Sequence, residues 1–418
     1  MDSLKIQGGV PLIGEIAISG AKNAALPLLA CSLMGGTGSL RLSNVPDLAD
    51  TRLMKALLRH LGVECAEMGE DIILSGEAQN YVAPYDLVSQ MRASILVMGP
   101  LLARFGEAQV SLPGGCAIGT RPVDLHIRAM QKMGAIVELA DGYVQARSPK
   151  GLSGAKIEFP LVSVGATENA MMAACLAKGQ TQLVNAAKEP EIIDLSACLV
   201  SMGAKIEGAG SDIITIEGVD SLHNGAHSVV PDRVEAGSYA IAAAMTGGAL
   251  TLTNMHSPHL ESLFAAMRQA GVSINSQGNT VQISSDGRYQ AVDIETQPHP
   301  GFPTDLQAQF MAMMCLAEGR SKISETIFEN RFMHVPELLR MGADIRVNGG
   351  TAMVRGRKSL TPAPVMATDL RASVSLVLAA LATPGRSTVS RIYHLERGYS
   401  DLQKKLGKCG AQLRRVKE

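Results

Sequence analysis

Seven cations stand at corresponding points of a chain whose formal net charge is only −1. Four precede or open a strongly apolar segment and three lead into an amphipathic one: Lys22, Arg92, Arg233 and Arg371, then Arg121, Arg331 and Arg397. A helix N-terminus carries a partial positive charge, so a cation there is unfavourable unless a carboxylate or a bound anion compensates it. Guanidinium and ammonium groups beside helix N–H groups bind phosphate and carboxylate strongly. The pattern therefore predicts a small substrate with at least two anionic groups.

Acidic residues beside some of these cations allow a simpler interpretation. Asp232 precedes Arg233, and Asp369 lies two residues before Arg371, so local pairing explains Arg233 and is favoured for Asp369. Asp305 stands where the other repeats carry cations. It either complements the helix dipole or, beside a cationic pocket, acts as a base for a hydroxyl group.

One of the seven cysteines differs from the rest. Cys116 follows two glycines in the loop SLPGGCAIGTRP, five residues before Arg121. A thiol near cations has a lowered pKa and is reactive, so Cys116 is a candidate for an acid/base or covalent role, although a cysteine in a loop more often has no function. The other six fit helix or strand positions and are interpreted as packing residues: Cys31, Cys65, Cys175, Cys198, Cys315 and Cys409. Without C-x-x-C or H-E-x-x-H spacing, we expect no metal and no cofactor.

An internal repeat sets the elements that must position these residues. A glycine follows an amphipathic run every 68 to 72 residues, at Gly62, Gly134, Gly203, Gly271, Gly342 and Gly410. Each is predicted to end a helix in the left-handed conformation, and the alternating residues after it predict two strands. An earlier segment of each repeat, such as ASVSLVLAALA, is apolar on all sides and predicts a fully buried helix.

One repeat therefore has the order strand, buried helix, strand, exposed helix, strand, strand. Three repeats closing around their buried helices would form an inside-out α/β barrel, and six repeats would form two. Only eight residues follow Gly410, so we expect the N-terminal residues to supply the strands that the sixth repeat lacks. The predicted domains are residues 22–229 and residues 1–21 plus 230–418, with a cleft between them that closes over a ligand.

The composition limits the classes of protein to which the chain can belong. It is 46% hydrophobic and 18% charged, which excludes a disordered chain. The balanced charge and the 3% of aromatic residues argue against a nucleic-acid-binding protein with stacking platforms. The N-terminal residues do not resemble a signal peptide, and the odd number of cysteines favours a reducing compartment, so we expect a cytoplasmic protein.

Several motifs together resemble one family. They are SGAKNAALP, MRAS, LPGGCAIGTRPVDLH, SVGATEN, AAKEPEI, FPTDLQAQF, ENRFMHVPEL, ATDLRAS and RIYHLERGY. Across all six repeats the chain resembles the enolpyruvyl transferase family, in particular its UDP-N-acetylglucosamine 1-carboxyvinyltransferases. The resemblance implies two inside-out α/β barrels and, as substrates, phosphoenolpyruvate and UDP-N-acetylglucosamine. The enolpyruvyl group would pass to the sugar 3-hydroxyl with release of phosphate, in the first committed step of peptidoglycan synthesis.

The same resemblance implies roles for individual residues. Lys22, Arg121 and Arg397 would contact the part derived from phosphoenolpyruvate. The nucleotide-sugar site would comprise Asn23, Arg121, Pro122, Val123, Asp124, Leu125, Val162, Ser163, Val164, Gly165, Asp305 and Ile327. Arg92, Arg331, Asp369 and Arg371 complete the substrate-binding set. Cys116 would act as proton donor or in product release, and Asp305 as base. Cys116 also implies alkylation by the epoxide antibiotic fosfomycin.

One position departs from the family pattern, and three alternatives stay open. Some members carry Lys where this chain has Leu161, so a side-chain contact to the nucleotide is lost there. The nearest alternative is transfer to shikimate 3-phosphate, whose enzymes lack the P-G-G-C loop. A nucleic-acid-binding protein and a regulatory paralogue without turnover are the others. We expect a monomer with no obligate protein, nucleic-acid or membrane partner.

Overall fold

The computed structural model describes residues 2–35, 38–112 and 123–417. These residues divide into two compact units, each with its own hydrophobic core. The terminal unit holds residues 2–19 and 231–417, and the central unit holds the described residues from 20 to 230. The domain limits given by the repeats, 22–229 and 1–21 plus 230–418, remain a prediction about the protein's domains.

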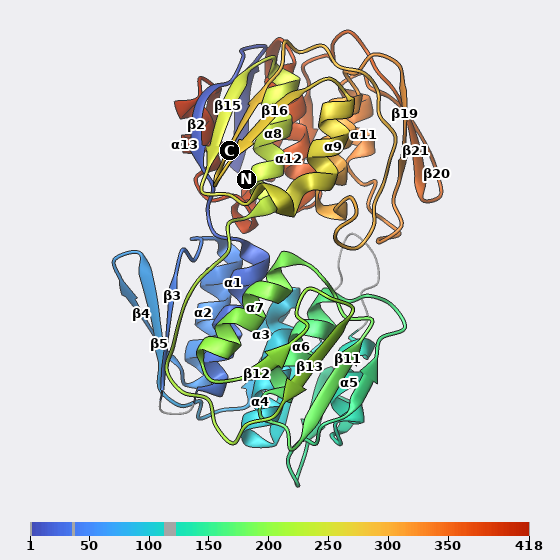
Figure 1. The fold of residues 1–418 in the computed structure, drawn as a ribbon. Coiled ribbons are helices and arrows are strands. Elements are labelled where there is room, and N and C mark those ends of the chain that lie inside the picture. Colours follow the sequence, from blue (N-terminus) through green and yellow to red (C-terminus); the bar gives the residue numbers. More distant parts are fainter. Residues whose placement is uncertain (1, 36–37, 113–122, 418) are drawn as a thin grey trace. The chain divides into compact units, whose positions relative to one another are not determined.

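Three four-stranded sheets of the central unit share one arrangement (Figure 1). In each, a strand pairs antiparallel with one neighbour and parallel with the other, as β3 does with β5 and β14. The three sheets, in strand order, are β14 (Gly225–Ser228), β3 (Ser39–Ser43), β5 (Asp71–Ser75) and β4 (Glu64–Met68); β6 (Val82–Ala83), β7 (Glu107–Ser111), β9 (Tyr143–Arg147) and β8 (Ile136–Ala140); and β10 (Lys156–Glu158), β11 (Gln180–Val184), β13 (Ile213–Glu217) and β12 (Lys205–Glu207).

The terminal unit repeats this arrangement with strands from both ends of the chain. Its sheets, in strand order, are β16 (Ser273–Gln277), β17 (Thr280–Ser284), β15 (Ala249–Thr253) and β2 (Ile13–Ala17); β18 (Ile294–Glu295), β19 (Arg320–Ser324), β21 (Thr351–Arg355) and β20 (Asp344–Asn348); and β22 (Pro364–Met366), β23 (Gly385–Ser390), β1 (Asp2–Gly8) and β24 (Gln412–Lys417). Leu4 of β1 lies opposite both Val389 and Arg415, so β1 completes the sheet of the short sixth repeat. The second N-terminal strand, β2, pairs instead with β15 of the fourth repeat, so the expectation that the N-terminal strands all join the sixth repeat is wrong for β2.

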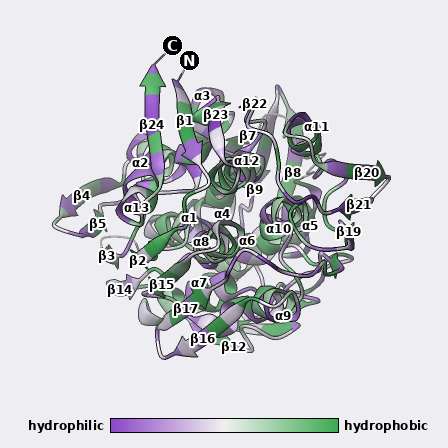
Figure 2. Cartoon of the chain, turned by 90° about the horizontal axis from the view of Figure 1, so that it is seen from above, coloured by the Kyte–Doolittle hydropathy of each residue, from purple (hydrophilic) through white to green (hydrophobic). Residues whose placement is uncertain are grey.

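The first helical segment of each repeat is buried, as its apolar sequence predicts. In the terminal unit these segments are α8 (Arg233–Thr246), η4 (Thr304–Leu306) with α10 (Gln307–Met314), and α12 (Leu370–Ala382), and the three pack against one another. In the central unit they are α1 (Lys22–Ala30) with η1 (Cys31–Met34), η2 (Arg92–Val97) with α4 (Met98–Phe105), and α6 (Val164–Ala174). Figure 2 shows hydrophobic residues along these helices, whereas the outer strand β24 carries mainly hydrophilic residues.

The second helical segments are amphipathic and end at the predicted glycines. They are α2 (Ala49–Leu61), α5 (Asp124–Lys132), α7 (Pro190–Ser201), α9 (Glu261–Gln269) after η3 (Ser257–Leu260), α11 (Val335–Arg340), and α13 (Leu402–Lys408) after η5 (Ile392–Arg397); a short α3 (Tyr85–Val88) is additional. All six repeat glycines have positive φ, between 84° and 109°. The left-handed conformation ends each helix without a Cβ penalty, so this prediction is confirmed.

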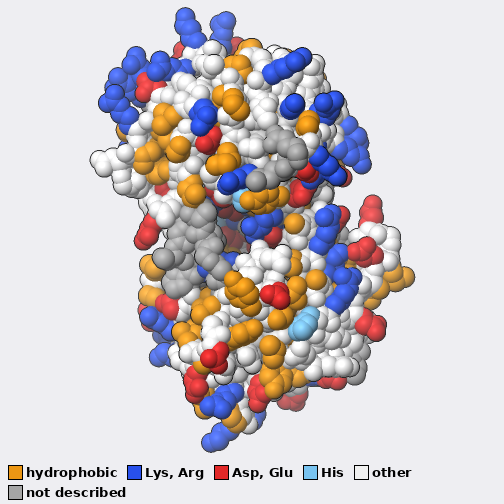
Figure 3. Space-filling model, turned by 180° about the vertical axis from the view of Figure 1, so that it is seen from behind, with side chains coloured by type: hydrophobic (Ala, Val, Ile, Leu, Met, Phe, Trp, Pro, Cys, Tyr) orange, Lys and Arg blue, Asp and Glu red, His pale blue; other side chains and the backbone are white. Residues whose placement is uncertain are grey.

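Helices inside and sheets outside, three repeats to a unit, match the predicted inside-out α/β fold. Among the described residues, no helix combines the length and apolarity that crossing a bilayer demands. Figure 3 shows basic and acidic side chains distributed together over the face drawn, in agreement with the nearly neutral net charge.

Candidate active site

Asp305 forms the centre of a buried charge cluster in the terminal unit. It lies in η4, directly before α10, and each of its carboxylate oxygens accepts a hydrogen bond from a different arginine. Arg331 Nη2 donates to Oδ1 and Arg371 Nη2 donates to Oδ2, both at 2.7 Å. The two arginine side chains are 3% and 7% exposed, while the Asp305 side chain is 26% exposed. The fold therefore brings together three predicted site residues, and the Asp305 side chain between the two arginines is only partly exposed.

This geometry fixes the charge of Asp305. Burial alone would raise its pKa, but the charges of Arg371 and Arg331 and their hydrogen bonds outweigh burial and hold the pKa well below the ordinary value. The carboxylate is ionised at neutral pH. Because a carboxylate offers about four lone-pair sites, oxygens that each accept one arginine can still accept a proton or a hydroxyl group.

Asp369 was expected to pair with the charged side chain of Arg371, but it binds the backbone of Arg371 instead. Asp369 is the N-cap of α12, and its Oδ1 accepts from the backbone N–H groups of Arg371 and Ala372 at 2.8 and 3.1 Å. The guanidinium of Arg371 instead reaches Asp305, 66 residues earlier. Asp369 therefore satisfies the helix start, and Arg371 is left to form the charge cluster.

Arg397 and Ile327 are also in the terminal unit. Arg397 is the last residue of η5. The pKa of His394 is lowered first by the partial burial of its own ring and then by the charge of Arg397, while the nearby Asp369 raises it. Ile327 is 36% exposed and lies between β19 and Arg331. Its backbone N–H donates to Glu325 Oε1 at 2.9 Å, so the position of Ile327 depends on a carboxylate that the motifs did not single out.

Lys22 opens α1 in the central unit, next to Asn23. The Lys22 ammonium lies 3.4 Å from Asp50 Oδ2, and the two side chains are 12% and 6% exposed. Asp50 comes from the first turn of α2, so the acid that compensates Lys22 is 28 residues away in sequence rather than adjacent. The cation at this helix start is thus balanced by a carboxylate that sequence inspection missed.

Arg92, at the start of η2, lies close to His126 of α5. Burial and then the charge of Arg92 lower the pKa of His126 to about 4, so the imidazole is neutral at neutral pH. Its Nδ1 accepts from Asn169 Nδ2 at 3.0 Å, which places the ring proton on Nε2. Asn169 also donates to Ile95 O at 3.0 Å and accepts from Gly99 N at 2.7 Å. A fully buried amide of α6 therefore links η2, α4 and α5, and both η2 and α5 carry predicted site residues. His126 has a structural role in this network.

The predicted nucleotide-sugar segments lie beside His126. Ser163 is the N-cap of α6 and its hydroxyl accepts from Ala166 N at 3.3 Å, while Gly165 lies so close to the imidazole that a Cβ there would be 3.2 Å from His126 Cε1. The segment formed by Val162, Ser163, Val164 and Gly165 thus adjoins the start of α5, where the structure places Val123, Asp124 and Leu125. Leu161 is 71% exposed.

Three buried glutamates form a second group that the motifs did not identify as a site. Glu168, Glu189 and Glu191 are 4%, 8% and 3% exposed. Burial, and then the charges of Glu191 and Glu189, raise the pKa of Glu168 well above its ordinary value. Glu189 occupies the N-cap position of α7, but its carboxylate accepts no capping hydrogen bond.

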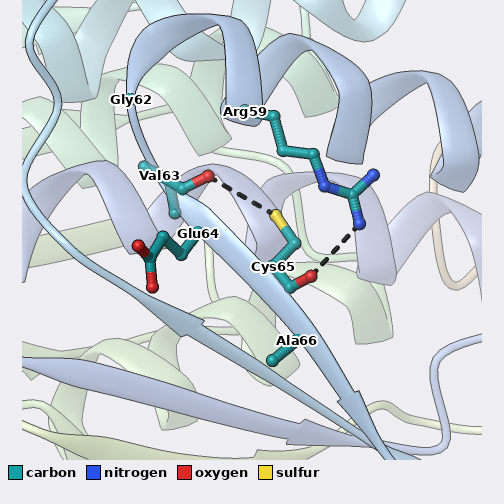
Figure 4. A pocket seen from close by; sticks show the side chains of 6 residues that line it. All are labelled: Arg59, Gly62, Val63, Glu64, Cys65 and Ala66. Carbon is teal, nitrogen blue, oxygen red and sulfur yellow. Dashed lines mark hydrogen bonds between the residues drawn. The ribbon is translucent and has the colours of Figure 1, made fainter.

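Three predicted residues, Cys116, Arg121 and Pro122, lie outside the described residues. Of the six cysteines interpreted as packing residues, five are buried: Cys31, Cys175, Cys198, Cys315 and Cys409. Cys65 is only partly buried and lines a surface hollow at the end of α2, where Arg59 Nη2 donates to its carbonyl oxygen at 3.1 Å (Figure 4). No predicted site residue lines this hollow, so it is not the candidate site.

Comparisons with known proteins agree with the motifs. The family model described as EPSP synthase (3-phosphoshikimate 1-carboxyvinyltransferase) matches residues 6–406. A UDP-N-acetylglucosamine 1-carboxyvinyltransferase of Granulibacter bethesdensis is 56% identical over the whole of both chains, and one of Caulobacter sp. is 56% identical over all of this chain and 98% of that protein. The enolpyruvyl transferase NikO from Streptomyces tendae has a TM-score of 0.90 and 26% identity, with 99% of both chains covered.

A more distant structure shows the fold alone. EPSP synthase from Acinetobacter baumannii has a TM-score of 0.76 and 16% identity over the whole of both chains. The family model and the full-length relatives confirm the resemblance found in the motifs. The chain therefore belongs to the enolpyruvyl transferase family that includes EPSP synthase, and within it to the UDP-N-acetylglucosamine 1-carboxyvinyltransferases.

Proposed function

We propose that this protein transfers the enolpyruvyl group of phosphoenolpyruvate to the 3-hydroxyl of UDP-N-acetylglucosamine and releases phosphate, the first committed step of peptidoglycan synthesis. The observation that carries the proposal is the identity of 54–56% over full length to relatives that bear this enzyme's name. The buried arginines around Asp305 support it, because phosphoenolpyruvate carries both a phosphate and a carboxylate.

The reaction proceeds by addition and then elimination. The sugar hydroxyl oxygen bonds to C2 of phosphoenolpyruvate, the hydroxyl proton passes to a base, and an acid protonates C3 to give a tetrahedral intermediate. C3 then loses a proton while the bond between C2 and the phosphate oxygen breaks, which forms the enol ether and frees phosphate. Asp305 is the proposed base and Cys116 the proposed acid or product-release residue.

The cations have the proposed role of stabilising negative charge on the intermediate and on the departing phosphate. Lys22, Arg121 and Arg397 would contact the phosphoenolpyruvate-derived part, and Arg92, Arg331 and Arg371 would complete the cationic surroundings, with Asp369 fixing the start of α12. The backbone of Ser163 and Gly165 is proposed to contact the nucleotide, because Leu161 offers no charged side chain for that purpose.

Asp305 suits a base that acts late. A carboxylate whose pKa is held low by two guanidinium groups binds a proton weakly, so it orients the hydroxyl group first and accepts the proton as the oxygen gains positive character. Asn23, Val123, Asp124, Leu125, Val162, Val164 and Ile327 would complete the binding site, together with Pro122.

The proposed setting is the cytoplasm, with the protein acting as a monomer that needs no cofactor, metal or obligate protein partner. Free thiols support a reducing compartment, since the six described cysteines form no disulfide bonds. Size-exclusion chromatography with light scattering measures the oligomeric state, and a mass near twice 44.0 kDa would contradict the monomer.

A phosphate-release assay tests the function. Wild type is expected to release phosphate from phosphoenolpyruvate with UDP-N-acetylglucosamine and not with shikimate 3-phosphate, and the reverse preference would refute the proposal. Asp305→Ala should abolish release. Cys116→Asp should retain release if a carboxyl group can replace the thiol, whereas loss in Cys116→Asp assigns the step to sulfur chemistry.

A further inference from the structure

Glu325 is a buried carboxylate at the end of β19, and the proposed mechanism does not use it. It is 7% exposed and accepts four hydrogen bonds. Oε1 accepts from Thr296 Oγ1 at 3.0 Å and from the backbone N–H groups of Ile327 and Phe328 at 2.9 and 3.1 Å. Oε2 accepts from Thr304 Oγ1 at 2.9 Å. A buried carboxyl group that accepts this many hydrogen bonds is well stabilised where it lies.

Three of these four donors come from two segments that carry predicted site residues, and the fourth, Thr296, directly follows β18. Thr304 directly precedes Asp305, while Ile327 and Phe328 begin the turn that ends in Arg331. The Arg331 guanidinium carbon lies 5.3 Å from the centre of the Phe328 ring. Since Arg331 also donates to Asp305 at 2.7 Å, both segments are joined twice, once through the charge pair and once through Glu325.

The contacts therefore form a closed circuit. It runs from Asp305 to Thr304, through Glu325 to Ile327 and Phe328, along the turn to Arg331, and back to Asp305. A circuit of short bonds limits how far any one member can move without breaking another. Glu325 stands opposite the charge pair in this circuit, so it sets the separation of the two segments without touching the pair.

We propose that Glu325 is a positioning residue for the transfer reaction, which holds the Asp305 segment and the Ile327–Arg331 turn at the separation the reaction requires. The inference rests on the proposed function, in which Asp305 accepts the hydroxyl proton and Ile327 lines the sugar site. Small displacements of reacting groups reduce rates strongly, so loss of the link lowers kcat while the fold remains.

Thr304 provides the sharpest test, because its hydroxyl makes the one hydrogen bond that the structure describes between Glu325 and the Asp305 segment. Thr304→Val keeps the shape and removes the hydroxyl, and we expect kcat/KM for UDP-N-acetylglucosamine to fall by about 10- to 100-fold, mainly through kcat. Thr304→Ser restores the hydroxyl and should recover most of the activity. Glu325→Ala removes all four bonds, so it should lower kcat further and raise KM for the sugar nucleotide as Ile327 is released.

Glu295→Gln is the matched control. Glu295 is exposed at the end of β18, next to Thr296, and the one hydrogen bond described for its side chain comes from Gln297. The Glu295→Gln variant should keep wild-type kcat and KM. If Thr304→Val and Glu325→Ala lower the melting temperature but keep wild-type kcat and KM in the folded protein, Glu325 serves stability alone and the proposal is overturned.

The two proposals fail in different ways. An inactive wild type refutes the proposed function before any variant is compared. Hydrogen exchange then decides the role of Glu325 without turnover. Loss of its carboxylate in Glu325→Ala should speed exchange at the amides of Ile327 and Phe328 at least about tenfold. Thr304→Val should speed exchange at the amide of Leu306, which donates to Pro303 O at 2.9 Å, while Glu295→Gln changes neither. Unchanged exchange in both variants would overturn the positioning role.

Discussion

Replacing Asp305 by Asn removes the charge that holds two buried guanidinium groups together. Each of the two 2.7 Å bonds joins charged partners, and such bonds contribute about 1.5–3 kcal/mol apiece. The Asp305 side chain is 26% exposed, so water screens the pair partly and the lower end of that range applies. The variant also leaves Arg331 and Arg371 buried without the carboxylate that pairs with both. We therefore expect Asp305→Asn to lower the free energy of unfolding by about 3 kcal/mol.

Urea unfolding at pH 7, followed by circular dichroism, measures this loss. Asp344→Asn is the matched control, because the Asp344 side chain is 29% exposed but pairs with a single arginine, Arg357, at 3.3 Å. An exposed pair of this kind contributes less than about 1 kcal/mol. A loss for Asp305→Asn as small as that of Asp344→Asn would refute the view that the cluster stores strong electrostatic stabilisation.

The dependence of this difference on pH gives an independent check. The folded-state pKa of Asp305 is depressed, so its stabilising contribution is complete above the unfolded value of about 3.9 and is lost as the pH falls toward the folded value. The stability of wild type and Asp305→Asn should therefore converge below about pH 4. A difference that stays constant down to pH 3 would mean that the stabilisation does not depend on the ionised carboxylate.

Three further predictions concern other parts of the molecule. Because the pKa of Glu168 is raised, the free energy of unfolding of wild type should fall as the pH rises above about 4.5. The slope should reach up to about 1.4 kcal/mol per pH unit until the carboxyl group ionises. Glu168→Gln should flatten this slope when it is measured by urea unfolding. Asn169→Leu leaves Gly99 N and Ile95 O unsatisfied, so it should cost about 2–4 kcal/mol and raise KM for the sugar nucleotide. Fosfomycin should inactivate wild type with a covalent mass increase at Cys116, and Cys116→Ser should show neither effect.

Much of the fold could be predicted because its signals are local. A helix stop at Gly62 or Gly203 needs only the preceding amphipathic run and the residue itself, and all six repeat glycines have the left-handed conformation that the spacing predicts. The burial of α12 follows from an apolar composition on every face. Each weak local signal occurs in all six repeats, which is why the architecture could be inferred from one sequence.

The charge partners could not be predicted, because the fold brings them from distant positions. Lys22 pairs with Asp50, and Arg371 with Asp305 rather than with nearby Asp369. Sequence proximity favoured Asp369, but at the N-cap position its carboxylate is already engaged by backbone N–H groups. Glu325 gave no signal, since its role depends on threonines 21 and 29 residues earlier.

Asp305, the acidic residue at the buried helix start of the fifth repeat, explains how the terminal unit tolerates its buried cations. Repetition places Arg371 at a buried helix start, and Arg331 converges on the same point, so without Asp305 two guanidinium charges would face each other. Asp305 occupies the corresponding position of its own repeat and compensates both. Each guanidinium has five N–H groups, and the structure describes one from each bonded to Asp305, so neither arginine must leave the carboxylate to bind an anion. The same pairing can therefore stabilise the protein without substrate and stay intact when the doubly anionic donor arrives.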